Sequence, residues 1–220
     1  MSTQHRDAKG RPIVAVTGLG IVTSLGQGKQ ANWDALTAGK SGIHRIERFP
    51  TEGLRTTIGG TVDFLFDGPF SAPELSEKLA TLAADEAVSQ SGLGESCDFP
   101  GELFMAVPPV EMEWPQKQEL AQSIAGDVDY DGLLREAATL KHKAMHEMFL
   151  FGTVADHIAD RFGTKGSPIS LSTACSSGAT AIQMGVEAIR RGDTTSALCI
   201  GTDGSVHAEA LIRFSLLSAL

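Results

Sequence analysis

The sequence predicts an α/β fold, in which helices pack against a buried central sheet, and three observations support this prediction. Four short apolar runs, at residues 13–16, 101–109, 168–173 and 195–201, have the length and composition of buried strands. Segments with helical periodicity lie between these runs, an alternation typical of layered α/β proteins. Hydrophobic residues make up 42% of the 220 residues and charged residues 20%, so the chain can bury a core of ordinary size.

The N-terminal part is expected to contain a buried strand, a further short strand and two helices. Residues 13–16 predict a buried strand that passes into a glycine-rich turn. Residues 29–42 predict a short helix that ends at Gly39 or Gly42, followed by loops with a short strand. A longer helix is predicted from Ser71 to Gly92, because Ser71 and Glu74 have the spacing of a capping box and Gly92 suits the C-terminal cap.

The middle of the chain changes from irregular to helical. Residues 111–130 are polar and without a clear period, so we expect no regular structure there. Residues 131–162 have a helical pattern, which we expect to form two helices with a break near Gly152. Residues 205–220 are expected to be helical or mixed.

The stretch "SPISLSTACSSGATAIQMGVEAIRRG", residues 167–192, places a cysteine between a predicted strand and a predicted helix. Apolar residues recur on one face of that helix, at positions 179, 182, 186 and 189, and we expect this face to pack on the core. Two arginines and Gly192 suit the C-terminal end of the helix. Cys175 is therefore expected on a sharp turn at the helix N-terminus.

A cysteine at this position has chemical consequences. The unpaired N–H groups and the dipole at a helix N-terminus favour the thiolate, which is the nucleophilic form. The same N–H groups can stabilise an oxyanion beside the sulfur, and the small residues around Cys175 leave room for a substrate carbonyl. We interpret Cys175 as a candidate nucleophile, with an inert buried cysteine as the alternative. For Cys199 we expect the inert alternative, and for Cys97 no role.

Two other patterns are weaker candidates for binding sites. "GLGIVT", residues 18–23, lacks the final glycine or alanine and the following helix of a dinucleotide fingerprint, so we interpret it as a turn that lets backbones pack closely. His142 and His146 lie four residues apart, but they do not form an H-E-x-x-H motif. We interpret them, with His157 and Asp160, as a solvated or partly packed face. We therefore expect neither a metal nor a cofactor.

Composition and charge narrow the partners and the compartment. The net charge is −9, which argues against nucleic-acid binding because such binding needs clustered lysine and arginine. We find no segment with the length and apolarity of a membrane span, and no secretory signal at the polar start of the sequence. Three cysteines do not make a disulfide framework. We therefore expect a cytoplasmic protein with reduced thiols.

Three ordered segments resemble the β-ketoacyl-[acyl carrier protein] synthases. They are "VAVTGLGIVTSLGQG" (residues 14–28), "STACSSGATAIQMGVEAIRRGDTTSALCIGTDGSV" (172–206) and "ALIRFSLLSAL" (210–220). The resemblance is greatest to the elongating synthases of type II fatty-acid synthesis, and it implies the first α/β half of the thiolase-like fold. It also implies that Cys175 takes an acyl group from a carrier thioester and passes it to decarboxylated malonyl-carrier.

The resemblance also implies residues that are not found in this sequence. The family completes its site with two histidines and a lysine from its second half, and none of the six histidines here lies in such a motif. We therefore expect residues 1–220 to be an N-terminal domain that ends before its last strand. Two alternatives stay open: a non-catalytic half-synthase that binds acyl carrier protein or a complete synthase, and a thiolase-fold hydrolase or acyl-CoA transferase.

Acyl carrier protein, loaded with acyl and malonyl groups, is the partner that the resemblance implies, together with a homodimer of the complete enzyme. Because these carriers are acidic, a net-negative synthase needs a local basic patch. Two sets of residues could provide one, and each could equally be a solvated face: Arg45, Arg48 and Arg55, or Arg135, Lys141 and Lys143.

Overall fold

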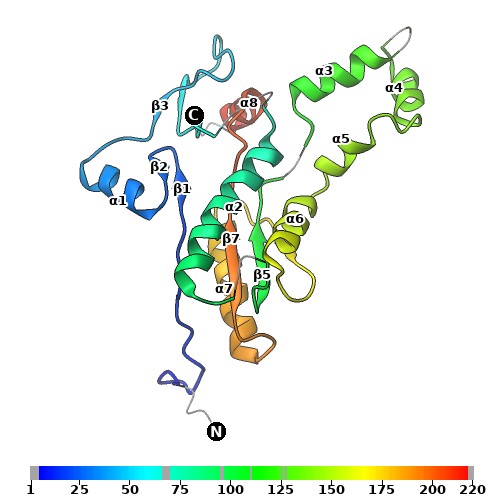
Figure 1. Ribbon diagram of the computed structural model, residues 1–220. Coiled ribbons are helices and arrows are strands. Elements are labelled where there is room, and N and C mark those ends of the chain that lie inside the picture. The colour runs from blue at the N-terminus through cyan, green and yellow to red at the C-terminus, as the bar shows by residue number, and fades with distance from the viewer. Residues whose placement is uncertain are drawn as a thin grey trace.

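A computed structural model describes residues 5–217 except 66–69, 95–96, 110, 125 and 127, and it has an α/β architecture (Figure 1). Its centre is a parallel sheet of three strands in the order β6-β5-β7. These strands are β5 (Glu102–Ala106), β6 (Ile169–Leu171) and β7 (Ala197–Gly201). The predicted runs at residues 101–109, 168–173 and 195–201 therefore each contain a strand.

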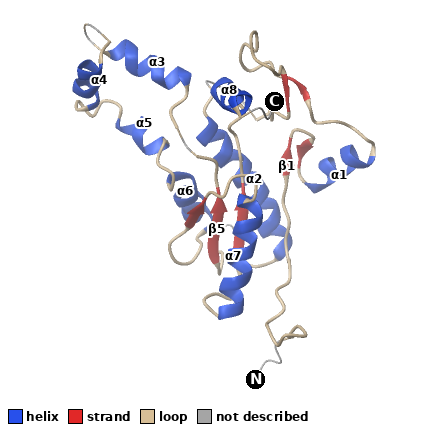
Figure 2. Ribbon diagram, turned by 180° about the vertical axis from the view of Figure 1, so that it is seen from behind, coloured by secondary structure: helices blue, strands red, loops and turns tan. Residues whose placement is uncertain are grey.

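Helices cover both faces of this sheet (Figures 1 and 2). On one face α2 (Ala72–Ser91) and α6 (Thr153–Phe162) form a core with Leu103 and Met105 of β5, whose side chains are fully buried. On the other face α7 (Ser177–Arg191) packs on the two intervening residues of β5, Phe104 and Ala106. Because side chains alternate along a strand, β5 belongs to both cores.

The face of α7 that contacts the sheet differs from the predicted one. Ala181, Gly185 and Ala188 are the buried residues, whereas Ile182, from the face predicted to pack inward, is 56% exposed. A Cβ on Gly185 would overlap the sulfur of Cys199 on β7. Helix and strand therefore approach so closely that only small side chains fit between them, and the larger apolar face points away from the sheet.

The predicted ends of α2 are confirmed. Ser71 is the N-cap and its hydroxyl accepts a hydrogen bond from the Glu74 N–H, while Gly92 ends the helix in the left-handed conformation. The interpretation of "GLGIVT" as a close-packing turn is confirmed as well. A Cβ on Gly18 or on Gly20 would overlap a backbone carbonyl of α2, so the segment lies directly against that helix.

The prediction of a buried strand at residues 13–16 is wrong. This segment forms no ladder within the described residues, and Ile13 and Val16 are 57% and 83% exposed. The chain lies against α2 at Gly18 and Gly20, after this segment. Small elements follow it: β1 (Val22–Thr23), β2 (Gly26–Gln27), α1 (Lys29–Thr37), β3 (His44–Arg45) and β4 (Ile58–Gly59).

An arm of short helices, residues 114–150, extends away from the sheet (Figure 1). It contains α3 (Trp114–Ser123), α4 (Tyr130–Ala137) and α5 (Lys143–Met148). The prediction of irregular structure over residues 111–130 is therefore wrong. The helical region 131–162 has three helices rather than two, with the expected break at Gly152 before α6 and another before α5. The last helix, α8 (Ala208–Leu216), follows β7, and none of the described helices is long and apolar enough to cross a membrane.

Candidate functional site

The three strands of the sheet end at one edge, where their continuations are tied together. Cys175 follows β6, a proline-containing loop follows β5, and residues 202–207 follow β7. The Val107 N–H donates to the Leu171 carbonyl at 3.2 Å, and the Thr202 N–H donates to the Ala106 carbonyl at 3.1 Å. The carboxyl edge of a parallel sheet is where open α/β folds bind their ligands. Cys175 therefore lies where the topology favours a site.

Cys175 lies on the predicted sharp turn between β6 and α7 and is exposed. Ala174 has φ +53°, an uncommon conformation for a residue with a side chain. Hydroxyl groups hold this turn on both sides. The Ser176 hydroxyl donates to the Thr173 carbonyl at 2.8 Å, and the Ser177 hydroxyl accepts from the Thr173 N–H at 2.8 Å.

The backbone N–H groups at the turn differ in whether they have a hydrogen-bond acceptor. The Ser176 and Ser177 N–H groups donate to the carbonyls of Thr173 and Ala174, whereas the Cys175 N–H donates no hydrogen bond within the described residues. A free N–H next to an exposed sulfur can accept the oxygen of a carbonyl that the sulfur attacks. The geometry is that of a nucleophile turn with one oxyanion donor in place.

The other two cysteines lie in different surroundings. Cys199 is partly buried on β7, and burial raises the pKa of its thiol to about 11, although a hydrogen bond with the Gly185 backbone acts in the opposite direction. A thiol with this pKa is almost entirely protonated near neutral pH, as expected for an unreactive packing residue. Cys97 is exposed in a loop far along the chain from the turn.

Two of the histidines singled out from the sequence, His142 and His157, pair with carboxylates. His142 precedes α5 and lies 3.3 Å from the Glu136 carboxylate, and His157 lies 2.8 Å from that of Glu77. Across the residues that the structure describes, no group of three or more His, Cys, Asp or Glu side chains is arranged to hold a metal ion. His142 is the N-cap of α5 and His146 lies within that helix, with the His146 N–H donating to the His142 carbonyl at 3.1 Å.

Two buried residues that the sequence patterns did not indicate also lie at this edge of the sheet. Glu113 follows β5 and His207 follows β7, and their side chains are 2% and 7% exposed. Glu113 is the N-cap of α3, where its N–H donates to the Gln116 side chain at 3.2 Å in a capping box, and Pro115 lies in the first turn. This spacing is the local signal that could have indicated Glu113, whereas His207 has no comparable one.

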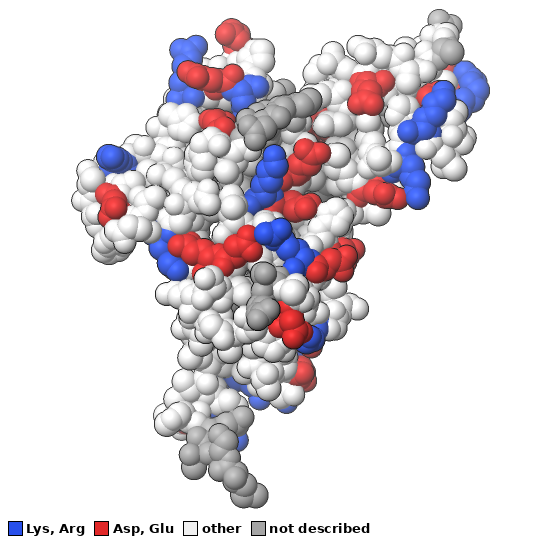
Figure 3. Space-filling view, viewed as in Figure 1, with Lys and Arg blue, Asp and Glu red and all other residues white. Residues whose placement is uncertain are grey.

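The two basic sets differ in availability. Arg48 is bound to the Asp63 carboxylate and lies over the ring of Phe70, so its charge serves the fold. Arg135, Lys141 and Lys143 lie on or beside α4 and α5, where Figure 3 shows lysine and arginine side chains gathered on the arm. Lys141 and Lys143 pair with local carboxylates of Glu136 and Glu147 and are 66% and 74% exposed.

Comparison with known proteins identifies relatives over nearly the whole chain. A family model described as "Beta-ketoacyl synthase, N-terminal domain" matches residues 11–220. A putative polyketide beta-ketoacyl synthase of Streptomyces cyaneus is 29% identical over 94% of this chain and 50% of its own length. A chloroplastic 3-oxoacyl-[acyl-carrier-protein] synthase II of Arabidopsis thaliana is 28% identical over 94% of this chain and 38% of its own length.

A solved structure shows the same fold. It is a type II polyketide synthase acyl-carrier protein in complex with its ketosynthase, and it is similar to this chain with a TM-score of 0.71 and 22% sequence identity. The match covers 93% of this chain and 48% of that one. The predicted thiolase-like fold is thus confirmed, and the chain spans about half the length of most of the proteins it matches.

Proposed function

Because the chain belongs to the β-ketoacyl synthase family, we propose that it is the N-terminal domain, residues 1–220, of a 3-oxoacyl-[acyl carrier protein] synthase, with Cys175 as the acyl-accepting nucleophile. One observation carries the proposal. The exposed thiol of Cys175 lies on the turn between β6 and α7, beside an N–H that has no partner among the described residues. An inert packing cysteine would not need this exposure or this strained turn.

The first step is acyl transfer. The Cys175 thiolate attacks the carbonyl carbon of an acyl thioester, and the oxygen gains negative charge, which the Cys175 N–H stabilises. The tetrahedral intermediate then breaks its bond to the carrier sulfur, and the carrier leaves as a thiolate. The acyl group remains on Cys175 as a new thioester.

The second step forms the carbon–carbon bond. A malonyl thioester loses carbon dioxide, and the electron pair left on its α-carbon attacks the carbonyl carbon of the Cys175 thioester. The bond to sulfur breaks and the Cys175 thiolate returns, so the product is a 3-oxoacyl chain two carbons longer. We expect the histidines that assist decarboxylation to lie outside residues 1–220. The chain by itself should therefore carry out only the first step.

Fatty-acid synthases and polyketide synthases of this family differ in their acyl substrate. We favour a fatty acyl chain, in line with the resemblance of residues 172–206 to elongating fatty-acid synthases. The relatives include a chloroplastic 3-oxoacyl-[acyl-carrier-protein] synthase II and a polyketide synthase, so a polyketide intermediate is the second candidate.

We propose acyl carrier protein as the partner, docked on the arm. The basic side chains of Arg135, Lys141 and Lys143 project there, whereas Arg48 is engaged by Asp63. The complex of a related ketosynthase with its acyl-carrier protein supports the choice of partner. A homodimer of the complete enzyme and a reducing cytoplasm, which would keep the Cys175 thiol reactive, belong to the same proposal.

The second candidate function is a non-catalytic half-synthase that binds a carrier protein or a complete synthase. Its basis is that no described histidine lies in a motif of the family's second half. This reading predicts carrier binding without any transfer of the acyl group to Cys175.

Acylation measured on the intact protein separates these functions. The chain is incubated with a long-chain acyl-carrier thioester, and with a 3-oxoacyl-carrier thioester in parallel, and its mass is recorded. We expect the mass to rise by one acyl group in the wild type and in Cys97→Ser, and to stay unchanged in Cys175→Ala. Preference for the unmodified acyl chain would indicate fatty-acid elongation, and preference for the 3-oxoacyl chain would indicate polyketide synthesis.

Two outcomes oppose the proposal. Acylation that persists in Cys175→Ala would assign the acceptor role to another residue. Carrier binding without any acylation would favour the half-synthase. A charge-reversed variant, Arg135→Glu with Lys141→Glu, should weaken carrier binding, whereas Arg45→Glu on β3 should bind as the wild type does.

A further inference from the structure

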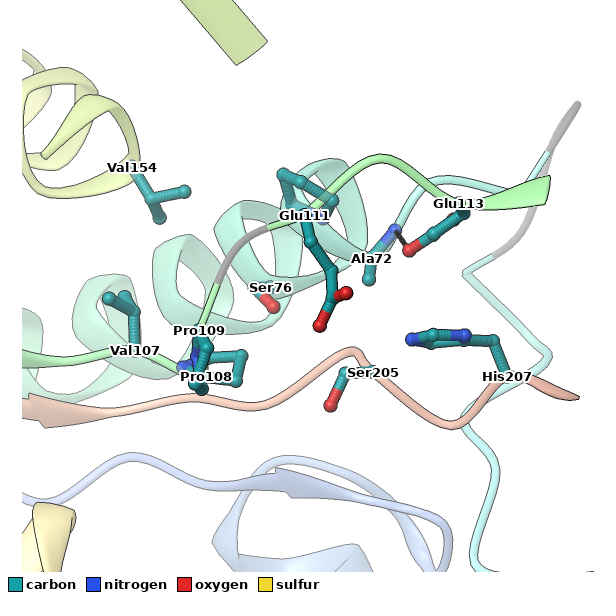
Figure 4. Close-up of a pocket in the computed structure, with 11 residues that line it drawn as sticks. Ala72, Ser76, Val107, Pro108, Pro109, Glu111, Glu113, Val154, Ser205 and His207 are labelled. Carbon is teal, nitrogen blue, oxygen red and sulfur yellow. Dashed lines mark hydrogen bonds between the residues drawn. The ribbon is translucent and has the colours of Figure 1, made fainter. Parts of the chain in front are cut away.

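The side chain of Glu113 lies beside Ala72 at the start of α2 and faces His207 (Figure 4). The helices α3 and α8 begin immediately after Glu113 and His207. The carboxylate of Glu113, immediately before α3, accepts the N–H of Ala72, the first residue of α2, at 3.0 Å. Glu209 of α8 accepts the N–H of Trp114, the first residue of α3, at 3.3 Å. His207 immediately precedes α8. The starts of α2 and α3 are thus each held by a carboxylate from outside the helix, and the start of α8 lies beside them; we call this arrangement the joint.

The Glu113 side chain is shielded from solvent, but its carboxylate is incompletely hydrogen-bonded. Glu113 is 2% exposed, and its Oε2 atom has no hydrogen bond with any described residue. The cavity beside it has a volume of about 10 Å³, close to the space of one water molecule. The residues that α2 contributes to its wall are uncharged: Ala72, Pro73 and Ser76. A buried carboxylate oxygen without a partner is costly when it is charged.

The charges around Glu113 are mixed. Two further carboxylates face it, from Glu111 and from Glu209 on α8, and one ammonium, from Lys117 on α3. Arg213 of α8 binds Glu111, and Lys117 binds Glu209 at 2.7 Å, so both cations are already engaged. His207 Nδ1 lies 3.3 Å from the Glu209 carboxylate without the alignment of a hydrogen bond, and burial lowers the pKa of this imidazole.

We propose that the joint is a proton-operated clamp, in which the protonated carboxyl of Glu113 holds the arm against the starts of α2 and α8 and the ionised carboxylate releases it. The neutral acid accepts the Ala72 N–H through one oxygen and offers a proton to the cavity through the other. The ionised form instead puts a third negative charge between Glu111 and Glu209.

The pH at which Glu113 ionises depends on the groups around it. Burial is the main effect and, with Glu209 and Glu111, it raises the pKa of Glu113 from 4.5 to about 7, against the opposing effects of the Ala72 N–H and Lys117. The positive ends of α2 and α3 also favour the anion. Because the folded chain holds more protons than the unfolded chain between about pH 4.5 and 7, its stability falls as the pH rises through this window.

A direct titration of the carboxyl group tests the clamp. The side-chain carboxyl carbons of glutamate are labelled with ¹³C, and the Glu113 signal is assigned by its loss in Glu113→Gln. We expect this signal to titrate with a midpoint near pH 7. A Glu113 midpoint below pH 5 would overturn the proposal, since the residue would then be a permanently ionised helix cap.

The mechanical consequence has its own readout. Amide hydrogen exchange of the arm is compared with that of α7 at pH 6 and pH 8, after correction for intrinsic exchange. We expect the arm to lose at least about tenfold in protection relative to α7 at pH 8, and Glu113→Gln, which cannot ionise, to abolish this loss. The melting temperature of the wild type should fall relative to that of Glu113→Gln by roughly 3–5 °C per pH unit in the window. If the protection of the arm relative to that of α7 is the same at pH 6 and at pH 8, no clamp opens.

Discussion

Two groups of helix starts lie at the carboxyl edge of one sheet, and they differ in what surrounds them. The start of α7 is open: Cys175 is exposed, and its N–H has no partner in the described part of the chain. The starts of α2, α3 and α8 are closed, and the first N–H groups of α2 and α3 each bind a carboxylate from another element. The open start can offer its polar groups to a ligand, whereas the closed starts use theirs to join elements.

The two sites also differ in where their support comes from. The turn at Cys175 is held by neighbours within a few residues, such as Thr173 and Ser177, and by the contact of α7 with the sheet. The joint is held by residues far apart in the sequence, such as Ala72 and Glu113. A substitution at the open site should therefore change chemistry more than stability, and a substitution at the closed site should do the reverse.

The largest expected difference between the two kinds of surroundings is in the rates at which the cysteines react. Because the pKa of Cys199 is about 11, its thiolate fraction at pH 8 is about 200-fold lower than that of an ordinary cysteine, and burial slows its reaction further. Alkylation with iodoacetamide, followed by peptide mass spectrometry, should therefore modify the exposed Cys175 and Cys97 much faster than Cys199. Equal rates for Cys199 and Cys97 would mean that the sheet and α7 separate readily.

A pair of glycine substitutions in α7 tests the support of the open site. Gly185→Ala places a methyl group against Cys199 and Ala197 and should destabilise the fold by about 2 kcal/mol. Gly178→Ala in the same helix has open space at that position and should be neutral or stabilising by up to about 1 kcal/mol. Urea unfolding measures both. Similar values for the two variants would contradict the close packing of α7 on β7.

The hydroxyl of Ser76 on α2 should also contribute to the stability of the fold. The hydroxyl of Ser76 on α2 accepts the buried N–H of Gly204 at 2.8 Å, which ties the loop after β7 to this helix. Ser76→Ala leaves that N–H without its partner and should cost about 1–3 kcal/mol of unfolding free energy. Ser89→Ala, at an exposed position of α2, is the matched control and should stay within about 0.5 kcal/mol of the wild type.

The smallest expected change in stability is at the open turn. Ala174→Gly relieves the positive φ but also increases the freedom of the unfolded chain, so the net change should be within about 1 kcal/mol. The rate of acylation should fall even so, because the sulfur of Cys175 is held less firmly. An unchanged acylation rate would show that the conformation of Ala174 is not needed to position the thiol.

Local signals were sufficient to predict α2, the turn at Cys175 and three of the four strands. Ser71 and Gly92 mark the ends of α2 through their own backbone chemistry, and the strand-turn-helix order around Cys175 follows from neighbouring residues. The helix α3 has no buried residue in the part of the chain that the structure describes, so hydrophobic periodicity could not indicate it.

Other features depend on contacts that no local pattern contains. Ile182 belongs to an apolar stripe that looks like a core face, but the small residues Ala181, Gly185 and Ala188 are what allow α7 to approach the sheet. Periodicity shows that a helix has a distinct face and does not show which face is buried. The capping-box spacing of Glu113 and Gln116 could have indicated the start of α3, but no spacing rule predicts that the Glu113 side chain also meets the start of α2.

The three-stranded sheet has a further consequence for measurements in solution. Among the described strands, β6 and β7 each pair with β5 alone, so their outer edges present unpaired backbone groups. Such edges can pair with the edge of another molecule, and a net charge of −9 opposes this association only at low ionic strength. Association should therefore increase with salt and with protein concentration, and a dilution series at fixed ionic strength separates it from folding.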